Sequence, residues 1–231
     1  MEIVLESLLS GAEKATGSVA VIDVFRAFTT AAVALANGAS RIIMVGSIED
    51  ALTLRDSGAA QVCMGEVRGR KPAEFEFGNS PFQLLDTAFT GTTIVQRTSA
   101  GTQGVIAAAH MADRLYATSL VTADATARAL ASGSPSRITL VAMGDNGTLR
   151  TSEDELCALH LRNLLEGRPG DPDAVRRMIL AGGEAERFRD PSRLHLPVGD
   201  LDVALDIDRY DFAVRVRLET GRPVARLERT H

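Results

Sequence analysis

The segment SVAVIDVFRAFTTAAVALANGASRIIMV, residues 18–45, determines the fold class. Residues 18–24 are apolar and rich in β-branched side chains, which is typical of a buried strand. Residues 27–36 are rich in alanine and predict a helix that stops at Gly38, because glycine can adopt the positive φ that ends a helix. Residues 41–45 form a second apolar run. The segment is therefore predicted to be a strand–helix–strand unit.

The same alternation continues along the chain and predicts a layered α/β fold. Further strands are expected over 60–64, 92–98, 115–119 and 138–143, and further helices over 47–56, 102–111 and 123–131. Strand–helix repeats of this kind favour a three-layer α/β/α arrangement around a mostly parallel, mixed sheet, with right-handed crossovers.

The last third of the chain departs from this alternation. Ser152 and Glu155 have the spacing of a capping box that opens a helix running to about residue 166, and Asp171-Pro172 predicts the start of another helix. Residues 212–218 and 223–227 predict a C-terminal antiparallel hairpin with a glycine in its turn. Since no linker or repeat divides the chain, one domain over residues 1–231 is expected.

Composition narrows the classes of protein. The chain has 231 residues, 45% of them hydrophobic, and a net charge of -5, which argues against a general nucleic-acid binder. No apolar run approaches the length of a membrane span, and the N-terminus does not resemble a signal peptide. Cys63 and Cys157 are interpreted as buried thiols in a reducing compartment. We therefore expect a cytoplasmic protein without nucleic-acid or membrane partners, and favour a homo-oligomer.

Carboxylates follow three of the predicted strands. They are Asp23, Glu66 and Asp145, and the loop after Asp145 leads to Glu153 and Asp154 in the first turn of a helix. Ligands of parallel sheets bind beyond the carboxyl ends of the strands, so these side chains are expected to converge. Oxygen ligands suit Mg²⁺, which usually keeps water and substrate phosphate in its shell. These five residues are the predicted metal ligands.

The fourth strand instead leads into a turn that suits an anion. Ser99, Gly101 and Thr102 lie where a strand enters a helix, so backbone N–H groups and the positive end of a helix dipole face one point. The Gly- and Pro-rich loop over residues 65–81 adds charged and polar side chains. The candidate clamps for phosphate or substrate are Arg26, Arg68, Lys71, Asn79, Ser80 and Arg97.

Structural explanations exist for the same residues. Asp23, Ser99 and Thr102 could simply cap helices, and Asp145-Asn146-Gly147 is also an ordinary turn sequence. Acidic residues in a first helical turn favour the dipole without any function. The P-loop, the dinucleotide fingerprint and the nucleophile elbow of α/β-hydrolases are all absent from the sequence. Asp200-Leu201-Asp202 is set aside because it follows no buried strand.

Four separated motifs, in order, resemble the 2-phosphosulfolactate phosphatase (ComB) family. They are residues 22–30 (IDVFRAFTT), residues 65–81 with Gly65-Glu66, Gly69, Lys71-Pro72 and FEFGNSP, residues 97–102 (RTSAGT), and residues 144–147 with SEDE at 152–155. The chain departs from the usual family residues at Phe28, Glu76 and Ala100. These differences leave the organic substrate open.

The resemblance implies a Mg²⁺-dependent phosphatase that converts 2-phosphosulfolactate to sulfolactate and phosphate, a step towards coenzyme M. On this interpretation Asp23, Arg26, Glu66 and Asp145 are catalytic, and the substrate is a small anionic 2-hydroxy-acid phosphate. Attack by water and a phospho-enzyme formed on Asp23 both stay open. The alternatives are a catalytically silent binder of an anionic metabolite, and another Mg²⁺ enzyme on the same fold.

Overall fold

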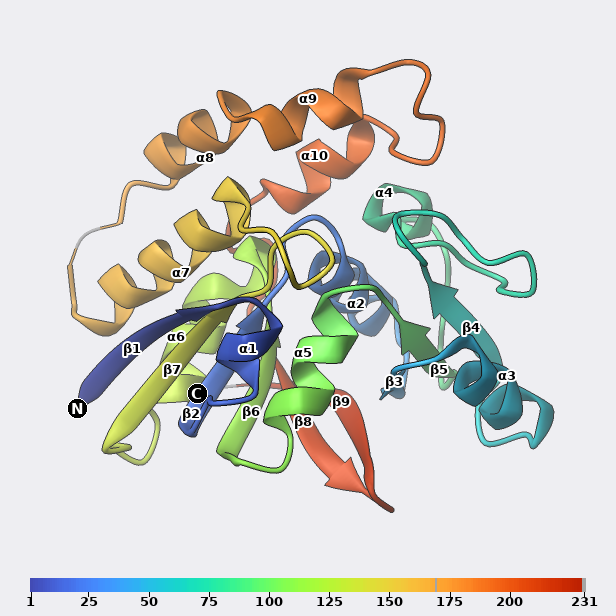
Figure 1. Cartoon of the computed structure of the whole chain (residues 1–231), viewed down its shortest axis with the longest axis horizontal. Coiled ribbons are helices and arrows are strands. Elements are labelled where there is room, and N and C mark those ends of the chain that lie inside the picture. The colour runs from blue at the N-terminus through green and yellow to red at the C-terminus, as the bar shows by residue number, and fades with distance from the viewer. Residues whose placement is uncertain (169, 230–231) are drawn as a thin grey trace.

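The computed structural model describes residues 1–168 and 170–229, which form a nine-stranded sheet with helices on both faces (Figure 1). The strand order is β1-β7-β2-β6-β8-β9-β3-β5-β4. The predicted α/β class is confirmed. None of the described helices is both long enough and apolar enough to cross a membrane.

Four parallel strands make up the first part of the sheet. They are β1 (Glu2–Ser7), β7 (Arg137–Ala142), β2 (Gly17–Ile22) and β6 (Ala112–Thr118). Strand β1 was not predicted, because its charged residues obscure the apolar alternation of an edge strand. The remaining parallel strands are β3 (Arg41–Val45), β5 (Thr93–Arg97) and β4 (Val62–Gly65).

The C-terminal hairpin joins the two parallel groups. Strands β8 (Ala213–Glu219) and β9 (Arg222–Glu228) pair with each other, while β8 pairs with β6 and β9 with β3, all antiparallel. The hairpin was predicted, but it lies at the centre of the sheet rather than at its margin. Because three antiparallel pairings separate them, the two groups of parallel strands run in opposite directions. A strong twist of the sheet through the hairpin is therefore needed to bring the carboxyl ends of both groups together.

Helices after the early strands cover one face of the sheet. Helices α1 (Leu8–Ala12), α2 (Ala27–Ala36) and α5 (Gly101–Ala108) contribute to one apolar core, and α4 (Pro81–Leu84) packs on α2. Helix α2 has the bounds predicted from its alanine-rich sequence. Nine of its ten residues are buried, which explains why it is apolar all round.

The opposite face is covered by helices from both halves of the chain. Helix α3 (Ile48–Asp56) packs on β3, β4 and β5, whereas α6 (Ala123–Ala131), preceded by a 3₁₀ turn (Leu120–Thr122), and α7 (Ser152–Leu165) pack on the first group of strands. The N-cap of α7 is Thr151, without a side-chain cap bond. The predicted Ser152–Glu155 capping box is therefore wrong: Glu155 accepts hydrogen bonds from Ser7 and Arg150 instead.

Three short helices close the carboxyl edge of the first strands. Helix α8 (Pro172–Leu180) begins after the predicted N-cap Asp171, and α9 (Gly183–Arg189) and α10 (Gly199–Ala204) follow it. Figure 1 shows α8, α9 and α10 arching above the ends of the strands. Phe188 of α9 packs edge-on against Phe25, with ring centroids 5.1 Å apart. This helical roof and the strand ends enclose the candidate site.

Candidate active site

Strand ends from both halves of the sheet meet in one cleft beneath α9. Its cavity volume is about 120 Å³, and the residues that follow β2, β4, β5 and β7 all contribute to its wall. Of the predicted site residues, those that line the cleft are Asp23, Arg26, Glu66, Arg68, Asn79, Ser99, Asp145 and Glu153. The convergence expected from the sequence is thus present.

Asp23 lies between the N-termini of two helices. Its Oδ1 atom accepts a hydrogen bond from the backbone N–H of Ala27 in α2 (2.9 Å). A Cβ atom placed on Gly101, the first residue of α5, would lie 2.9 Å from Asp23 Oδ2, so only glycine allows this approach. Burial raises the pKa of Asp23 to about 6, with a further contribution from Glu66, against the lowering effect of the two helix N–H groups. The predicted anion site at α5 therefore already faces a carboxylate of the chain itself.

Glu153 brings a second carboxylate into the cleft. It is only 4% exposed, and its Oε2 atom has no hydrogen-bond partner in the described part of the chain. Burial, together with the negative charges of Glu184 and Asp23, raises the pKa of Glu153 to about 7, against the lowering effect of the Thr151 hydroxyl. A buried carboxylate oxygen without a partner is costly unless a proton or a cation compensates it.

Glu66 and Asp154 hold the loops of the site together. Glu66 accepts from the backbone N–H groups of Ser99 and Gly69 (both 2.5 Å) and from the Ser99 hydroxyl (3.1 Å). Asp154 accepts from the backbone N–H groups of Val24 (2.7 Å) and Gly144 (2.8 Å). Burial, together with the charges of Glu153 and Asp23, raises the pKa of Asp154 well above its usual value. Both side chains therefore fix the ends of strands relative to one another.

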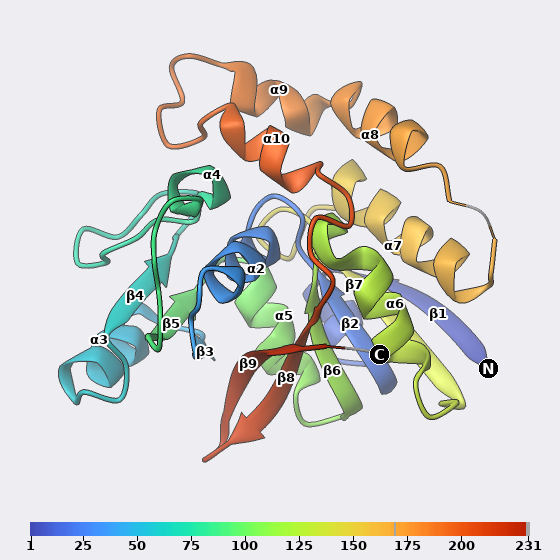
Figure 2. The same cartoon turned by 180° about the vertical axis from the view of Figure 1, so that it is seen from behind.

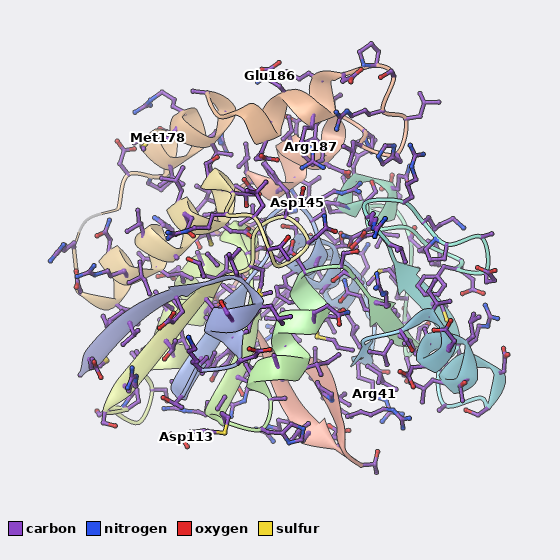
Figure 3. All side chains as sticks on the ribbon, viewed as in Figure 1. Arg41, Asp113, Asp145, Met178, Glu186 and Arg187 are labelled. Atoms are coloured by element: carbon purple, nitrogen blue, oxygen red, sulfur yellow. The ribbon has the colours of Figure 1, made fainter. Side chains whose placement is uncertain are left out.

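Asp145 lies at the rim of the cleft, opposite an arginine that the sequence analysis missed. Arg187 Nη1 of α9 is 3.5 Å from Asp145 Oδ2 and 2.9 Å from Glu184 Oε2. Figure 3 shows Arg187 above Asp145, whereas Glu186 on the same helix points outward. Arg187 lines the cleft and stays about two-fifths exposed, so a ligand can reach its guanidinium.

Most of the predicted basic clamps already have partners. Arg26 lines the cleft, but its guanidinium is 4% exposed and binds Asp200 (2.8 Å) and the carbonyl of His195 (2.9 Å). Lys71 and Arg97 do not line the cleft; Lys71 Nζ donates to a loop carbonyl, and Arg97 donates to the carbonyl of Glu66. Arg68 lines the cleft and is exposed.

The hydroxyl residues divide in the same way. Ser99 lines the cleft and accepts a hydrogen bond from the backbone N–H of Arg68 (2.9 Å). Thr102 is buried inside α5 and pairs with Thr98; the N-cap of α5 is Ala100, without a side-chain cap bond, so neither Ser99 nor Thr102 has the N-cap role considered from the sequence. Asn79 lines the cleft, and its buried Oδ1 has no hydrogen-bond partner among the residues that the structure describes.

Asp200 lies on α10 and follows no buried strand, as the sequence analysis expected, but it has structural contacts that the sequence did not reveal. It is 0% exposed and accepts hydrogen bonds from Ser80 Oγ (2.6 Å), Phe82 N (3.1 Å) and Arg26. Burial raises the pKa of Asp200, and Arg26 opposes that rise. Asp200 therefore joins the roof helix α10 to the loop that carries Ser80 and to the start of α2. No sequence signal marked it, because its burial depends on the packing of α10 against α4.

The five predicted metal ligands do not form one shell. Within residues 1–168 and 170–229, no three His, Cys, Asp or Glu side chains lie close enough together to hold a metal ion. Glu66 and Asp154 use their oxygens on backbone N–H groups, and Asp145 faces Arg187. Asp23 and Glu153 fit a cation better, because their mutual repulsion and the unpartnered Glu153 oxygen would both be relieved by a positive charge.

Comparison with known proteins gives the family. The sequence model of 2-phosphosulpholactate phosphatase matches residues 5–184. The chain belongs to the 2-phosphosulfolactate phosphatase family. It is 36% identical over 214 residues to a "Probable 2-phosphosulfolactate phosphatase" of Thermus thermophilus, covering 90% of this chain and 87% of that protein. Proteins of the same printed name from Thermotoga petrophila (36% over 151 residues; 65% and 64%) and Bacillus subtilis (30% over 174 residues; 74% of each) are also similar.

Membership of this family of phosphatases agrees with the resemblance inferred from the sequence motifs. The matched region ends at Glu184, so it includes the strand-end carboxylates and stops short of Arg187 and Asp200. Those two residues come from the roof helices. The family model thus includes the strand-end carboxylates of the cleft, but most of α9 and all of α10 lie outside the matched region.

Proposed function

We propose that the protein hydrolyses the phosphate monoester of a small anionic 2-hydroxy acid in a Mg²⁺-dependent reaction, with 2-phosphosulfolactate as the substrate. The names printed for the relatives support the substrate. The observation that supports the metal dependence is the buried Oε2 of Glu153, which has no partner in the described part of the chain and lies in the same cleft as Asp23. The volume of about 120 Å³ suits a small metabolite rather than a polymer.

Asp23 and Glu153 would hold the ion. One or two carboxylates, with water and substrate phosphate completing the shell, are usual for Mg²⁺ in enzymes of this kind. When bound, Mg²⁺ would supply positive charge that offsets the negative charge of the phosphoryl group.

The remaining cleft residues position the substrate. The N-terminus of α5 faces Asp23 and would orient this carboxylate for the ion. Arg68, in the loop after β4, and Arg187, on α9, both line the cleft and would bind the other anionic groups of the substrate. Glu66 and Asp154 keep the strand ends in register, so their contribution is to orient the reacting groups.

A panel of phosphate esters tests this proposal. Phosphate release would be measured from 2-phosphosulfolactate, phospholactate and a neutral sugar phosphate, each with Mg²⁺ and with EDTA. We expect metal-dependent release that is fastest with 2-phosphosulfolactate. Release that persists in EDTA would contradict the metal dependence, and absence of release from every ester by folded protein would favour a silent binder.

Two broader expectations belong with this function. We infer a role in the cytoplasm, in the formation of sulfolactate for coenzyme M, and self-association of the chain. Gel filtration with light scattering would check the second, and a mass equal to that of one chain would contradict it.

A further inference from the structure

A second cavity lies on the sheet away from the cleft. It has a volume of about 410 Å³ and lies between α6 and the β8–β9 hairpin; α6 packs against β8, and Figure 2 shows this side of the molecule. It shares no lining residue with the cleft. Arg114 in its wall pairs in register with Ser18 of β2, five residues before Asp23, or roughly 16 Å along the strand at about 3.3 Å per residue.

The wall of this cavity is strongly basic. Its charged side chains are five arginines and one carboxylate, Arg114, Arg128, Arg215, Arg217, Arg229 and Glu228. This is the reverse of the whole chain, which has a net charge of -5. Arg128 forms ion pairs with Asp124 and Asp211, neither of which lines the cavity, so part of the charge of the wall is already compensated. Among the described residues, Glu228 offers the one carboxylate within the wall, and it lies 4.0 Å from Arg217.

The strand register places like charges together. Arg215 of β8 lies directly opposite Arg226 of β9, and directly opposite Tyr116 of β6 on its other side. Like charges at opposed positions of neighbouring strands destabilise a sheet unless something offsets them. Arg226 has an ion pair with Glu219, but Arg215 has no carboxylate partner in the described residues.

Arg215 is held in place as part of a built site. Its Nη1 donates to the hydroxyl of Tyr116 (2.7 Å), and its guanidinium carbon lies 4.8 Å from the centre of the Tyr116 ring. Tyr116 is 1% exposed, so it is a fixed support. The Nε atom of Arg215 is buried without a hydrogen-bond partner among the described residues. A buried guanidinium N–H without an acceptor is a costly arrangement that a bound oxyanion would satisfy.

We propose that this cavity binds a polyanion of the di- or triphosphate class. Guanidinium groups bind phosphoryl oxygens in a bidentate manner, and several of them around one cavity favour an anion of high charge. The cavity volume, more than three times that of the cleft, accommodates a ligand larger than a single phosphate group. The site is independent of catalysis, so its ligand need not be a substrate.

Isothermal titration with pyrophosphate and tripolyphosphate tests the site in the full chain. The Asp23→Asn variant serves as the reference, because the binding expected there does not require a working cleft. The double variant Arg217→Gln/Arg229→Gln changes two exposed side chains and should fold normally, which its unfolding midpoint would verify. Arg222→Gln, an exposed arginine of the same hairpin outside the cavity, is the matched control.

We expect saturable binding of one polyphosphate to the wild type and to Asp23→Asn, weakening as salt is added. Since a charged hydrogen bond contributes about 1.5–3 kcal/mol, the double variant should bind about ten-fold more weakly or worse, and Arg222→Gln within about two-fold of the wild type. Equal binding by the double variant and the wild type, loss of binding in Asp23→Asn, or no saturable binding at all would overturn the proposal. None of these outcomes depends on phosphate release by the cleft.

Discussion

Removing the carboxylate of Asp200 should destabilise the whole roof of the cleft. Asp200→Ala leaves Ser80 Oγ and Phe82 N without their acceptor and deprives Arg26 of its counter-ion in a site where Arg26 is 4% exposed. The two carbonyls that remain near Arg26 do not carry a full charge. Breaking a buried ion pair on one side typically costs about 3–5 kcal/mol, because it leaves an uncompensated charge.

This loss is a large share of the stability of the chain. Total free energies of unfolding are about 5–15 kcal/mol for natural domains. For a chain of this size the loss corresponds to a decrease of roughly 6–20 °C in Tm. Urea unfolding followed by circular dichroism measures it, with Asp202→Ala as the control, because Asp202 is exposed on the same helix.

A second substitution separates lost charge compensation from lost packing. If the buried charge of Arg26 causes the instability, Arg26→Met in the Asp200→Ala background should restore part of the stability. A decrease below about 1 kcal/mol for Asp200→Ala, the size of an exposed pair, would refute the reasoning. The reasoning would also be refuted if Arg26→Met destabilised the Asp200→Ala variant further.

Three further results are expected. Gly65→Ala should abolish phosphate release and should unfold more readily than the control Gly58→Ala. Both glycines have a positive φ, but only at Gly65 would a Cβ overlap the backbone carbonyl of Arg97 in strand β5. Equal stability of the two variants would contradict this expectation. Burial lowers the pKa of His160 below its ordinary 6.5. As the pH decreases, the unfolded chain therefore binds a proton at this histidine before the folded chain does. At pH values below about 6.5 the free energy of unfolding should decrease, by at most ~1.4 kcal/mol per pH unit. Urea unfolding from pH 7 to 5 should show a weaker pH dependence for His160→Gln than for the wild type or exposed His110→Gln, and equal slopes would refute it. Arg187→Ala should raise KM for 2-phosphosulfolactate about ten-fold or more with a smaller effect on kcat, and an unchanged KM would exclude substrate contact.

The fold was predictable where local pattern determines structure. The alanine-rich helix α2 and the apolar strands around it follow directly from residues 18–45, since period and glycine position are local properties. The position of the β8–β9 hairpin at the centre of the sheet was not predictable. It depends on which strands pair over more than a hundred residues, and many pairings satisfy the same alternation.

The site was predictable in its acidic part and less so elsewhere. Asp23 and Glu66 follow buried strands, so the rule about strand ends located both. The roles of Arg26, Lys71 and Arg97 were not readable, because a charged residue in a motif does not reveal which partner it has in the fold. Asp200 and Arg187 lie on short helices whose packing brings them to the cleft.

The claim that Asp23 and Glu153 form a metal-dependent phosphatase site is tested most directly by metal binding and turnover in the same samples. Mg²⁺ binding and phosphate release from 2-phosphosulfolactate would be measured for the wild type, Glu153→Gln and Glu155→Gln; Glu155 lies on the same helix but outside the cleft, paired with Arg150. We predict that Glu153→Gln loses both and Glu155→Gln keeps both. Full Mg²⁺ binding and full release by Glu153→Gln would contradict the account.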